Sequence, residues 1–109
     1  MTMTEEYAAS EPSRAAVDAL DGLTLLEFGA PWCGHCRAAQ QPLAQVLAER
    51  PALRHLKIED GPGRPLGRSF RVKLWPTLIL LRQGVEIARA VRPTTADAIE
   101  QILGNAGQA

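Results

Sequence analysis

Blocks of apolar residues, separated by polar turns, predict a protein with both strands and helices. Residues Leu23 to Phe28 are apolar except for Thr24 and Glu27, as expected for a strand covered on both faces of a sheet. Leu78 to Leu81 form a second run of this kind, and Gln83-Gly84 then predicts a turn into a hairpin strand. These segments predict the centre of a sheet.

Apolar residues at helical spacing predict the main helices. Ser10 is expected to cap the first helix, which ends at Asp21-Gly22. A longer helix is predicted from about Cys33 to Arg50, with a kink at Pro42 because proline lacks a backbone donor. The last helix is expected to begin after Thr94 or Thr95 and to end at Gly104.

The remaining segments complete an α/β order. Alternation from His55 to Glu59 predicts a strand with Leu56 and Ile58 facing inward, and a loop and a short helix around 66–70 follow it. Residues 1–9 are weakly patterned, so we expect a loose tail or a short edge strand in which Tyr7 is the only plausible anchor. We therefore predict one domain, residues 10–109, with a central mixed sheet of four to five strands flanked by helices.

Charge and composition exclude several classes of function. Twelve basic and twelve acidic residues cancel in this chain of 109 residues, so the net charge favours neither nucleic acid nor an anionic membrane surface. No run approaches the roughly 18 apolar residues of a membrane span. The first residues are acidic and do not resemble a secretory leader, so we expect a cytoplasmic protein; a leader removed from the sequence would instead allow a periplasmic one.

The charges are unevenly distributed along the chain. The N-terminal segment is acidic, and the second half carries a series of basic residues: Arg64, Arg68, Arg71, Lys73, Arg82, Arg89 and Arg92. Two readings stay open, namely ordinary solvated surface and a docking face for an acidic partner.

Both cysteines lie in Cys33-Gly34-His35-Cys36, between a predicted strand and a predicted helix. Unpaired N–H groups and the helix dipole stabilise a thiolate at a helix N-terminus. We therefore expect Cys33 to ionise more readily than a free cysteine and to attack a target disulfide. Cys36, one helical turn further on, is expected to be less exposed and to resolve the mixed disulfide.

Three neighbours are candidates to modify this chemistry. His35 can carry a positive charge near neutral pH, which stabilises the reduced form; the alternative is an exposed turn residue without a role. Trp32 is expected either to lie exposed beside Cys33 and contact a substrate, or to pack partly into the core. Glu27 is costly to bury as a charge, so its pKa must rise or it must have a partner.

The stretch from Leu25 to Arg37 resembles the active-site region of the thioredoxin superfamily, and Cys33-Gly34-His35-Cys36 is the tetrapeptide typical of protein disulfide isomerase domains. Further along the chain, Trp75-Pro76-Thr77 is similar to the cis-proline loop of this family, and a strand, a turn and a C-terminal helix follow it. The resemblance implies a thioredoxin-like fold in which Pro76 is cis and packs against the cysteines. The backbone beside Pro76 would pair with an extended substrate.

The resemblance also implies a role for Glu27. Many thioredoxins have a buried aspartate at the matching position, and it is thought to carry protons to and from the resolving cysteine. Glu27 would then deprotonate Cys36 as it attacks. His55 is a candidate partner for Glu27, because the alignment puts it where a lysine is common.

Four departures from the family pattern bear on specificity. Gly29 replaces a common aromatic residue, and Pro42 lies one position later than the usual helix proline. Trp75 is bulky where a β-branched residue is usual, and Arg92 stands where a groove glycine is common. Trp75 and Arg92 would narrow and charge the groove, which predicts an unusual set of partners.

We therefore expect an enzyme, a protein-disulfide oxidoreductase that cycles Cys33 and Cys36 and needs no cofactor or metal. Its expected partners are protein disulfides or dithiols, with thioredoxin reductase or glutathione as electron donor; we expect a monomer that binds neither nucleic acid nor membrane. One alternative is a binding module with little turnover, favoured by the altered groove. The other is metal or iron–sulfur binding through Cys33, His35 and Cys36, although a helical turn points these groups apart.

Overall fold

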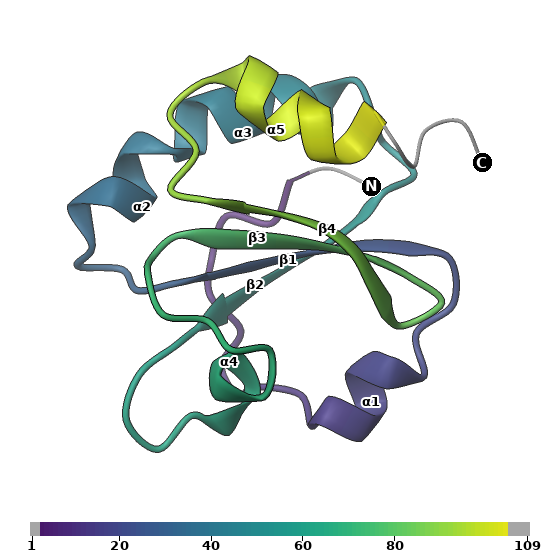
Figure 1. The fold of residues 1–109 in the computed structure, drawn as a ribbon. Helices are drawn as coiled ribbons and strands as arrows, with labels where there is room; N and C mark the ends of the chain where they lie inside the picture. Colours follow the sequence, from purple (N-terminus) through teal and green to yellow (C-terminus); the bar gives the residue numbers. More distant parts are fainter. Residues whose placement is uncertain (1–2, 105–109) are drawn as a thin grey trace.

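A four-stranded sheet with strand order β2-β1-β3-β4 forms the centre of the molecule (Figure 1). The computed structural model describes residues 3–104 of the chain. Its strands are β1 (Leu23–Gly29), β2 (Arg54–Glu59), β3 (Thr77–Arg82) and β4 (Val85–Val91). Its helices are α1 (Arg14–Asp18), α2 (Gly34–Ala38), α3 (Gln40–Ala48), α4 (Pro65–Ser69) and α5 (Ala96–Gly104). β1 is parallel to β2 and antiparallel to β3, so the predicted mixed α/β sheet is confirmed.

The two faces of the sheet bury separate apolar clusters. α3 and α5 cover one face, while α1 and α4 lie on the other (Figure 1). Because side chains alternate along a strand, Leu25 packs under α3 and α5, whereas Leu26 and Phe28 pack on the opposite side. Glu27 shares the face of Leu25, and its partner across the strand pair is Lys57. The strand therefore carries its carboxylate to the α3 side of the sheet.

The long helix expected from Cys33 to Arg50 is two helices. α2 ends at Ala38 and α3 begins at Gln40, with Ala39 between them. Pro42 lies in the first turn of α3, and without an N–H it cannot bond to the carbonyl of Ala38 one turn earlier. The predicted kink is thus a break three residues ahead of the proline. The break separates the short helix that carries the cysteines from the helix that packs on the sheet.

Other expected boundaries need smaller corrections. Ser13, not Ser10, caps α1, and its hydroxyl accepts the N–H of Ala16 at 3.0 Å. Ser10 cannot be the cap because α1, which has five residues, begins only at Arg14. Thr95 caps the last helix by accepting the N–H of Ala98 at 3.1 Å. Leu56 is half-buried and Ile58 is buried against the same cluster, as predicted for that strand.

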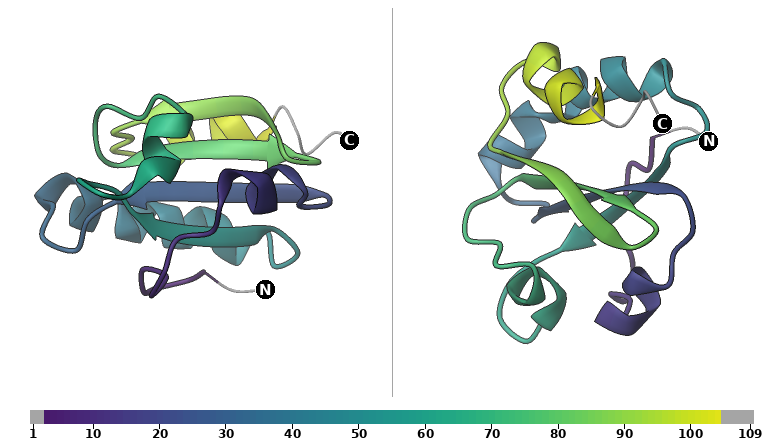
Figure 2. Two further views of the ribbon diagram at one scale, coloured as in Figure 1. Left: turned by 90° about the horizontal axis from the view of Figure 1, so that it is seen from below. Right: turned by 45° about the vertical axis from the view of Figure 1, so that its right-hand side comes forward.

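Residues 3–9 run beside β2 at one edge of the sheet (Figure 2). They form neither the loose tail nor the regular strand that the sequence suggested. Thr4 donates its backbone N–H to His55 Nδ1 at 2.9 Å, and Ala8 donates its N–H to the Lys57 carbonyl at 2.9 Å. We call residues 3–9 the N-terminal strap. Residues 1–2 of the expected tail and 105–109 of the expected domain lie outside the described residues.

No helix within residues 3–104 is long and apolar enough to cross a lipid bilayer.

Candidate active site

The two cysteines lie where β1 passes into α2. Cys33 is the N-cap of α2, and its sulfur accepts the N–H of Cys36 at 3.2 Å. Both side chains are buried, with 8% of Cys33 exposed and 1% of Cys36. Neither takes part in a disulfide in this structure. The predicted order of exposure is therefore confirmed: solvent and substrates reach Cys33 before Cys36.

The environment of Cys36 opposes its ionisation. Burial is the largest cause that raises the pKa of this thiol from 9.0 to about 12. The hydrogen bond with Cys33 and the negative charges of Cys33 and Glu27 act in the same direction, while a backbone hydrogen bond to Ala30 acts against them. Cys36 therefore needs help to lose its proton at neutral pH.

Glu27 lies buried near Cys36 and has two partners. His55 Nε2 lies 2.9 Å from one carboxylate oxygen, and Gln40 Nε2 donates to the other at 2.8 Å. The Thr4 N–H is a donor, so His55 Nδ1 must be the acceptor and carries no proton. The ring proton is therefore on Nε2 and points at Glu27. The structure thus pairs Glu27 with His55, as the sequence suggested. This satisfies a carboxylate that is only 1% exposed.

Gln40 and Lys57, which the sequence analysis did not single out, join this cluster. Gln40 also donates to the carbonyl of Cys36 at 2.8 Å, and its own oxygen accepts from Lys57 Nζ at 3.0 Å. Lys57 is the residue across from Glu27 in the parallel strand pair. The strand alternation of β2 sends both side chains to the α3 face. We call Glu27, Gln40, His55 and Lys57 the buried polar cluster.

Two tryptophans border the opposite, solvent-facing side of the cysteine pair. Trp32 is 69% exposed, so it does not pack into the core, and its contact with a substrate stays a prediction. Its ring meets Trp75 edge to face, with centroids 5.3 Å apart. Trp75 packs against the small cluster of Ala30, Cys33 and Cys36, and its Nε1 donates to Asp60 at 2.8 Å. The indole of Trp75 is therefore fixed beside Cys33.

Arg92 lies against the loop that contains Pro76. The Trp75–Pro76 bond is cis, and Arg92 donates its backbone N–H to the Pro76 carbonyl at 2.8 Å. Its Nε donates to the Trp75 carbonyl at 2.9 Å. Arg92 has φ of 51°, a left-handed conformation that favours glycine. Thr77 turns inward and bonds to the Leu74 carbonyl at 2.6 Å.

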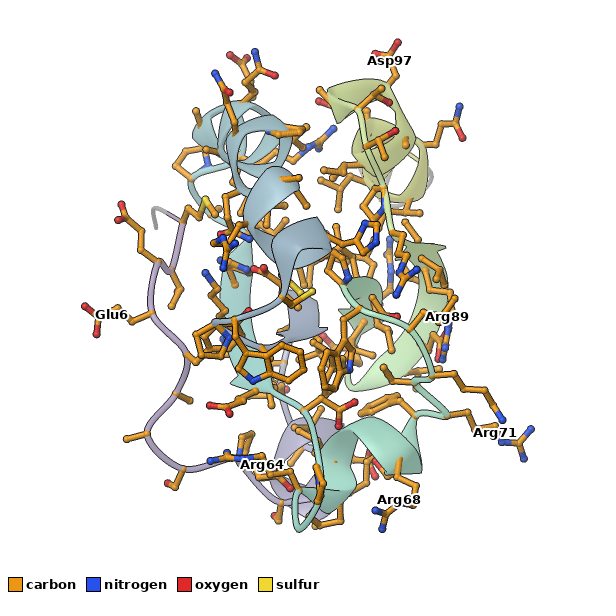
Figure 3. All side chains as sticks on the ribbon, turned by 90° about the vertical axis from the view of Figure 1, so that its left-hand side faces the viewer. Glu6, Arg64, Arg68, Arg71, Arg89 and Asp97 are labelled. Carbon is orange, nitrogen blue, oxygen red and sulfur yellow. The ribbon has the colours of Figure 1, made fainter. Side chains whose placement is uncertain are left out.

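His35 is exposed on α2 rather than buried with the sulfurs. It lines a hollow of about 70 Å³ together with Arg92, Pro93 and Thr94. Three further basic side chains lie on the side of the molecule away from Glu6 of the N-terminal strap, namely Arg68, Arg71 and Arg89 (Figure 3). Arg89 is paired there with Glu86 at 2.6 Å.

Tyr7, expected only as an anchor, reaches the cysteines from the N-terminal strap. A Cβ placed on Gly29 would lie 3.1 Å from the Tyr7 hydroxyl oxygen and 2.5 Å from the Cys36 sulfur. Both atoms therefore lie next to the Gly29 backbone. Sequence reasoning could not find this contact, because no periodic pattern ties residues 3–9 to β1. The one signal was Gly29 in place of an aromatic residue, because a glycine leaves room there for another side chain.

Within residues 3–104 no group of three His, Cys, Asp or Glu side chains is arranged to hold a metal ion.

Comparison with known proteins adds to this geometry. The family model described as Thioredoxin matches residues 6–105. A thioredoxin of Chlamydia muridarum is 36% identical over 83 residues, which cover 75% of this chain and 80% of the relative. Protein disulfide-isomerase A2 of Pongo abelii is 44% identical over 64 residues, 55% of this chain but only 12% of that protein.

Among solved structures, reduced thioredoxin 2 from Pseudomonas aeruginosa PAO1 is 53% identical and has a TM-score of 0.87. The alignment covers 98% of this chain and 100% of that one.

Proposed function

The chain belongs to the thioredoxin family and is a thiol–disulfide oxidoreductase, and we propose how its residues divide the reaction. Neither the binding module nor the metal site is favoured by these relatives. The observation that carries the proposal is the difference between the two cysteines: Cys33 caps α2 and is 8% exposed, while Cys36 is 1% exposed and lies within the electrostatic influence of Glu27.

In the proposed reaction, the Cys33 thiolate attacks one sulfur of a target disulfide. A bond forms between Cys33 and that sulfur, and the other target sulfur leaves as a thiolate that takes up a proton. Cys36 then attacks the Cys33 sulfur, the protein disulfide forms, and the second target sulfur leaves in the same way. Two electrons pass from the protein dithiol to the target. In the opposite direction the same steps donate a disulfide.

Glu27 is the proposed acceptor of the Cys36 proton. A base is needed because the pKa of Cys36 is raised to about 12, mainly by burial. The Nε2–H of His55 and the amide of Gln40 fix the orientation of the carboxylate, at 2.9 and 2.8 Å. His55 is thus a positioning residue in this proposal.

His35 is proposed to favour the reduced state by placing a cation close to the α2 N-terminus. Its neighbour in the small hollow, Arg92, adds a second positive group on that side. Replacing His35 with proline should make the couple more reducing, as measured by equilibration with glutathione. An unchanged equilibrium would count against this role.

The substrate groove is proposed to run over Trp32, Trp75 and the backbone at Pro76, with Arg92 at its border. Thr77, also expected to bind substrate, is only 1% exposed and is not part of this groove. The exposed Trp32 ring offers apolar contact to a polypeptide, and the backbone of Trp75 offers pairing to an extended segment. The Trp75 carbonyl already accepts from Arg92, so a substrate must share that acceptor or displace the guanidinium. An acidic side chain near the target disulfide would gain from Arg92 in either case.

Members of the thioredoxin family act on protein disulfides and are reduced by thioredoxin reductase. We extend both partners to this chain, with glutathione as the alternative donor. Bacterial thioredoxins are typically soluble proteins of the cytoplasm, and the proposal includes the same location and a monomeric state.

Trapping the mixed disulfide tests the proposal. Cys36→Ser protein mixed with a protein disulfide should accumulate a covalent adduct, and peptide mapping should place it on Cys33. Cys33→Ser protein is the matched control and should give little adduct. Equal adduct formation through Cys36 in that control would contradict the assignment of roles.

A further inference from the structure

The N-terminal strap is fixed to the same strand that supplies the buried polar cluster. Thr4 bonds to His55 through its N–H, at 2.9 Å to Nδ1, and through its hydroxyl, at 2.8 Å to the carbonyl. Lys57 Nζ donates to the Glu5 carbonyl at 2.9 Å, and Ala8 donates to the Lys57 carbonyl at 2.9 Å. Both flanks of Tyr7 are therefore held against β2.

The ring and hydroxyl of Tyr7 are positioned separately. Lys57 Nζ lies 4.8 Å from the centre of the ring, a cation–π contact. The hydroxyl fills the space left by the absent side chain of Gly29, next to the Cys36 sulfur. Figure 3 shows the side chain of Glu6 pointing away from the body of the molecule. The side chain of the next residue, Tyr7, points inward toward Gly29. Tyr7 and Cys36 also line a common cavity of about 400 Å³ with Gln40 and Lys57.

We propose that the Tyr7 hydroxyl donates a hydrogen bond to the Cys36 sulfur and thereby stabilises the thiolate that resolves the mixed disulfide. This makes Tyr7 a catalytic residue, since it touches a reacting atom. The inference rests on the proposed function, in which Cys36 is the resolving cysteine. It assigns a role to a residue that lies outside the cysteine tetrapeptide, the proline loop and β1.

The hydroxyl is not consumed in the step. The Cys36 S–H proton passes to the Glu27 carboxylate, and the Cys36 thiolate forms a bond to the Cys33 sulfur. The bond between Cys33 and the target sulfur breaks, the target thiolate takes up a proton from solvent, and Glu27 returns its proton to solvent. Tyr7 keeps its O–H bond and donates to the sulfur while that sulfur carries negative charge.

The surroundings keep Tyr7 protonated. Burial is the main cause that raises the pKa of its hydroxyl, and the charges of Cys36, Glu27 and Cys33 and the hydrogen bond to Cys36 raise it further. Among the described residues, two cations lie nearby: Lys57 over the ring, and Arg37, which lines the same hollow as Tyr7. Cys36 itself faces Cys33 and Glu27 in addition to Tyr7. A neutral donor therefore faces the sulfur at every pH at which the enzyme would work.

Stopped-flow reaction of the reduced protein with a chromogenic aromatic disulfide separates the two steps. Attack by Cys33 releases one aromatic thiol, and resolution by Cys36 releases the second. Tyr7→Phe removes only the hydroxyl and keeps the ring on Lys57. A hydrogen bond to a charged group is typically strong enough that its loss should slow the second release roughly tenfold at neutral pH and move its pH midpoint up by about one unit. The first release should not change.

Thr4→Val is the matched control, because it removes a side-chain bond of the N-terminal strap but keeps the backbone N–H to His55. It should lower thermal stability without moving the pH midpoint of the second release. An unchanged second release in Tyr7→Phe, or the same midpoint shift in Thr4→Val, would overturn the proposal for Tyr7. Cys36→Ser tests the underlying function separately: if that variant still releases both thiols, the resolving role of Cys36 fails, whatever Tyr7 does.

Discussion

The two sides of the cysteine pair are built from different chemistry. The solvent-facing side carries Trp32, Trp75 and Arg92, and Trp32 is 69% exposed. The inner side is the buried polar cluster, in which Glu27 and His55 are 1% and 2% exposed. Cys33 belongs to the first side and Cys36 to the second.

This difference separates partner choice from proton control. Exposed side chains in water change binding and its dependence on salt, but they do little to the pKa of a buried thiol. Buried charges and hydrogen bonds act strongly over short distances because the local dielectric is low. Changes on the solvent-facing side should therefore affect the first chemical step, and changes on the inner side the second.

Among changes on the inner side, Glu27→Gln should have the largest effect on the rate of the second thiol release. Loss of the proposed general base should slow the second thiol release about a hundredfold at neutral pH, a typical contribution of such catalysis. The first release should keep its rate. Both rates come from the stopped-flow reaction with the aromatic disulfide.

Glu27→Asp is the matched control for this change. It keeps a carboxylate, shorter by one methylene, and should recover most of the lost rate. If Glu27→Gln resolves as fast as the unaltered protein, Glu27 is not the base.

Gly29→Ala tests how tightly the inner side is packed. A Cβ at this position would lie 2.5 Å from the Cys36 sulfur and 3.1 Å from the Tyr7 hydroxyl, so one of them must move. We expect the free energy of unfolding of the reduced protein to fall by about 1–3 kcal/mol, the usual cost of overpacking. Chemical denaturation measures it. Gly34→Ala is the control, because a Cβ there meets nothing within 4 Å; an equal loss in both variants would refute the packing argument.

On the solvent-facing side, Arg92→Ala should change the rate of the first step for charged substrates. Unit charges about 4 Å apart in water interact by roughly 1 kcal/mol, so reduction of an acidic peptide disulfide should slow about fivefold at low salt. A neutral peptide disulfide of the same length should react at its former rate. Equal slowing for both peptides would show that Arg92 shapes the groove rather than selecting charge.

The smallest predicted effect at neutral pH is that of the Cys36 thiol on the free energy of unfolding, which appears only at higher pH. Because burial raises the pKa of Cys36 from 9.0 to about 12, the folded reduced protein keeps a proton that the unfolded chain releases. The unfolded state then binds fewer protons, so the contribution of Cys36 to stability is complete below pH 9 and is lost as the pH rises toward about 12. Unfolding free energies should fall more steeply over this window in the unaltered reduced protein than in Cys36→Ser. Parallel curves would contradict the raised pKa.

Periodicity and local signals predicted the sheet and the solvent-facing residues well. The apolar runs that became β1 and β3 are buried on both faces, and their pattern is visible without any partner. The cysteine tetrapeptide and Trp75-Pro76-Thr77 predicted the two loops that meet at the site. The pairing of Glu27 with His55 was also within reach, because a buried carboxylate needs a partner.

The inner side was harder to predict because its contacts join distant segments. Tyr7 and Cys36 are far apart in sequence, and the N-terminal strap has no apolar period that reveals which strand it follows. Lys57 reads as an exposed position in an alternating strand, yet the strap covers it, and it is only 7% exposed. Such contacts depend on the packed fold rather than on local preference.

A double-mutant cycle tests the separation of the two sides most directly. The two thiol releases are measured with the acidic peptide attached to the aromatic disulfide, in the unaltered protein, Glu27→Gln, Arg92→Ala and the double variant. We predict that Arg92→Ala slows only the first release and Glu27→Gln only the second, with changes in activation free energy that add within about 0.5 kcal/mol. A larger coupling, or slowing of the first release by Glu27→Gln, would contradict the account.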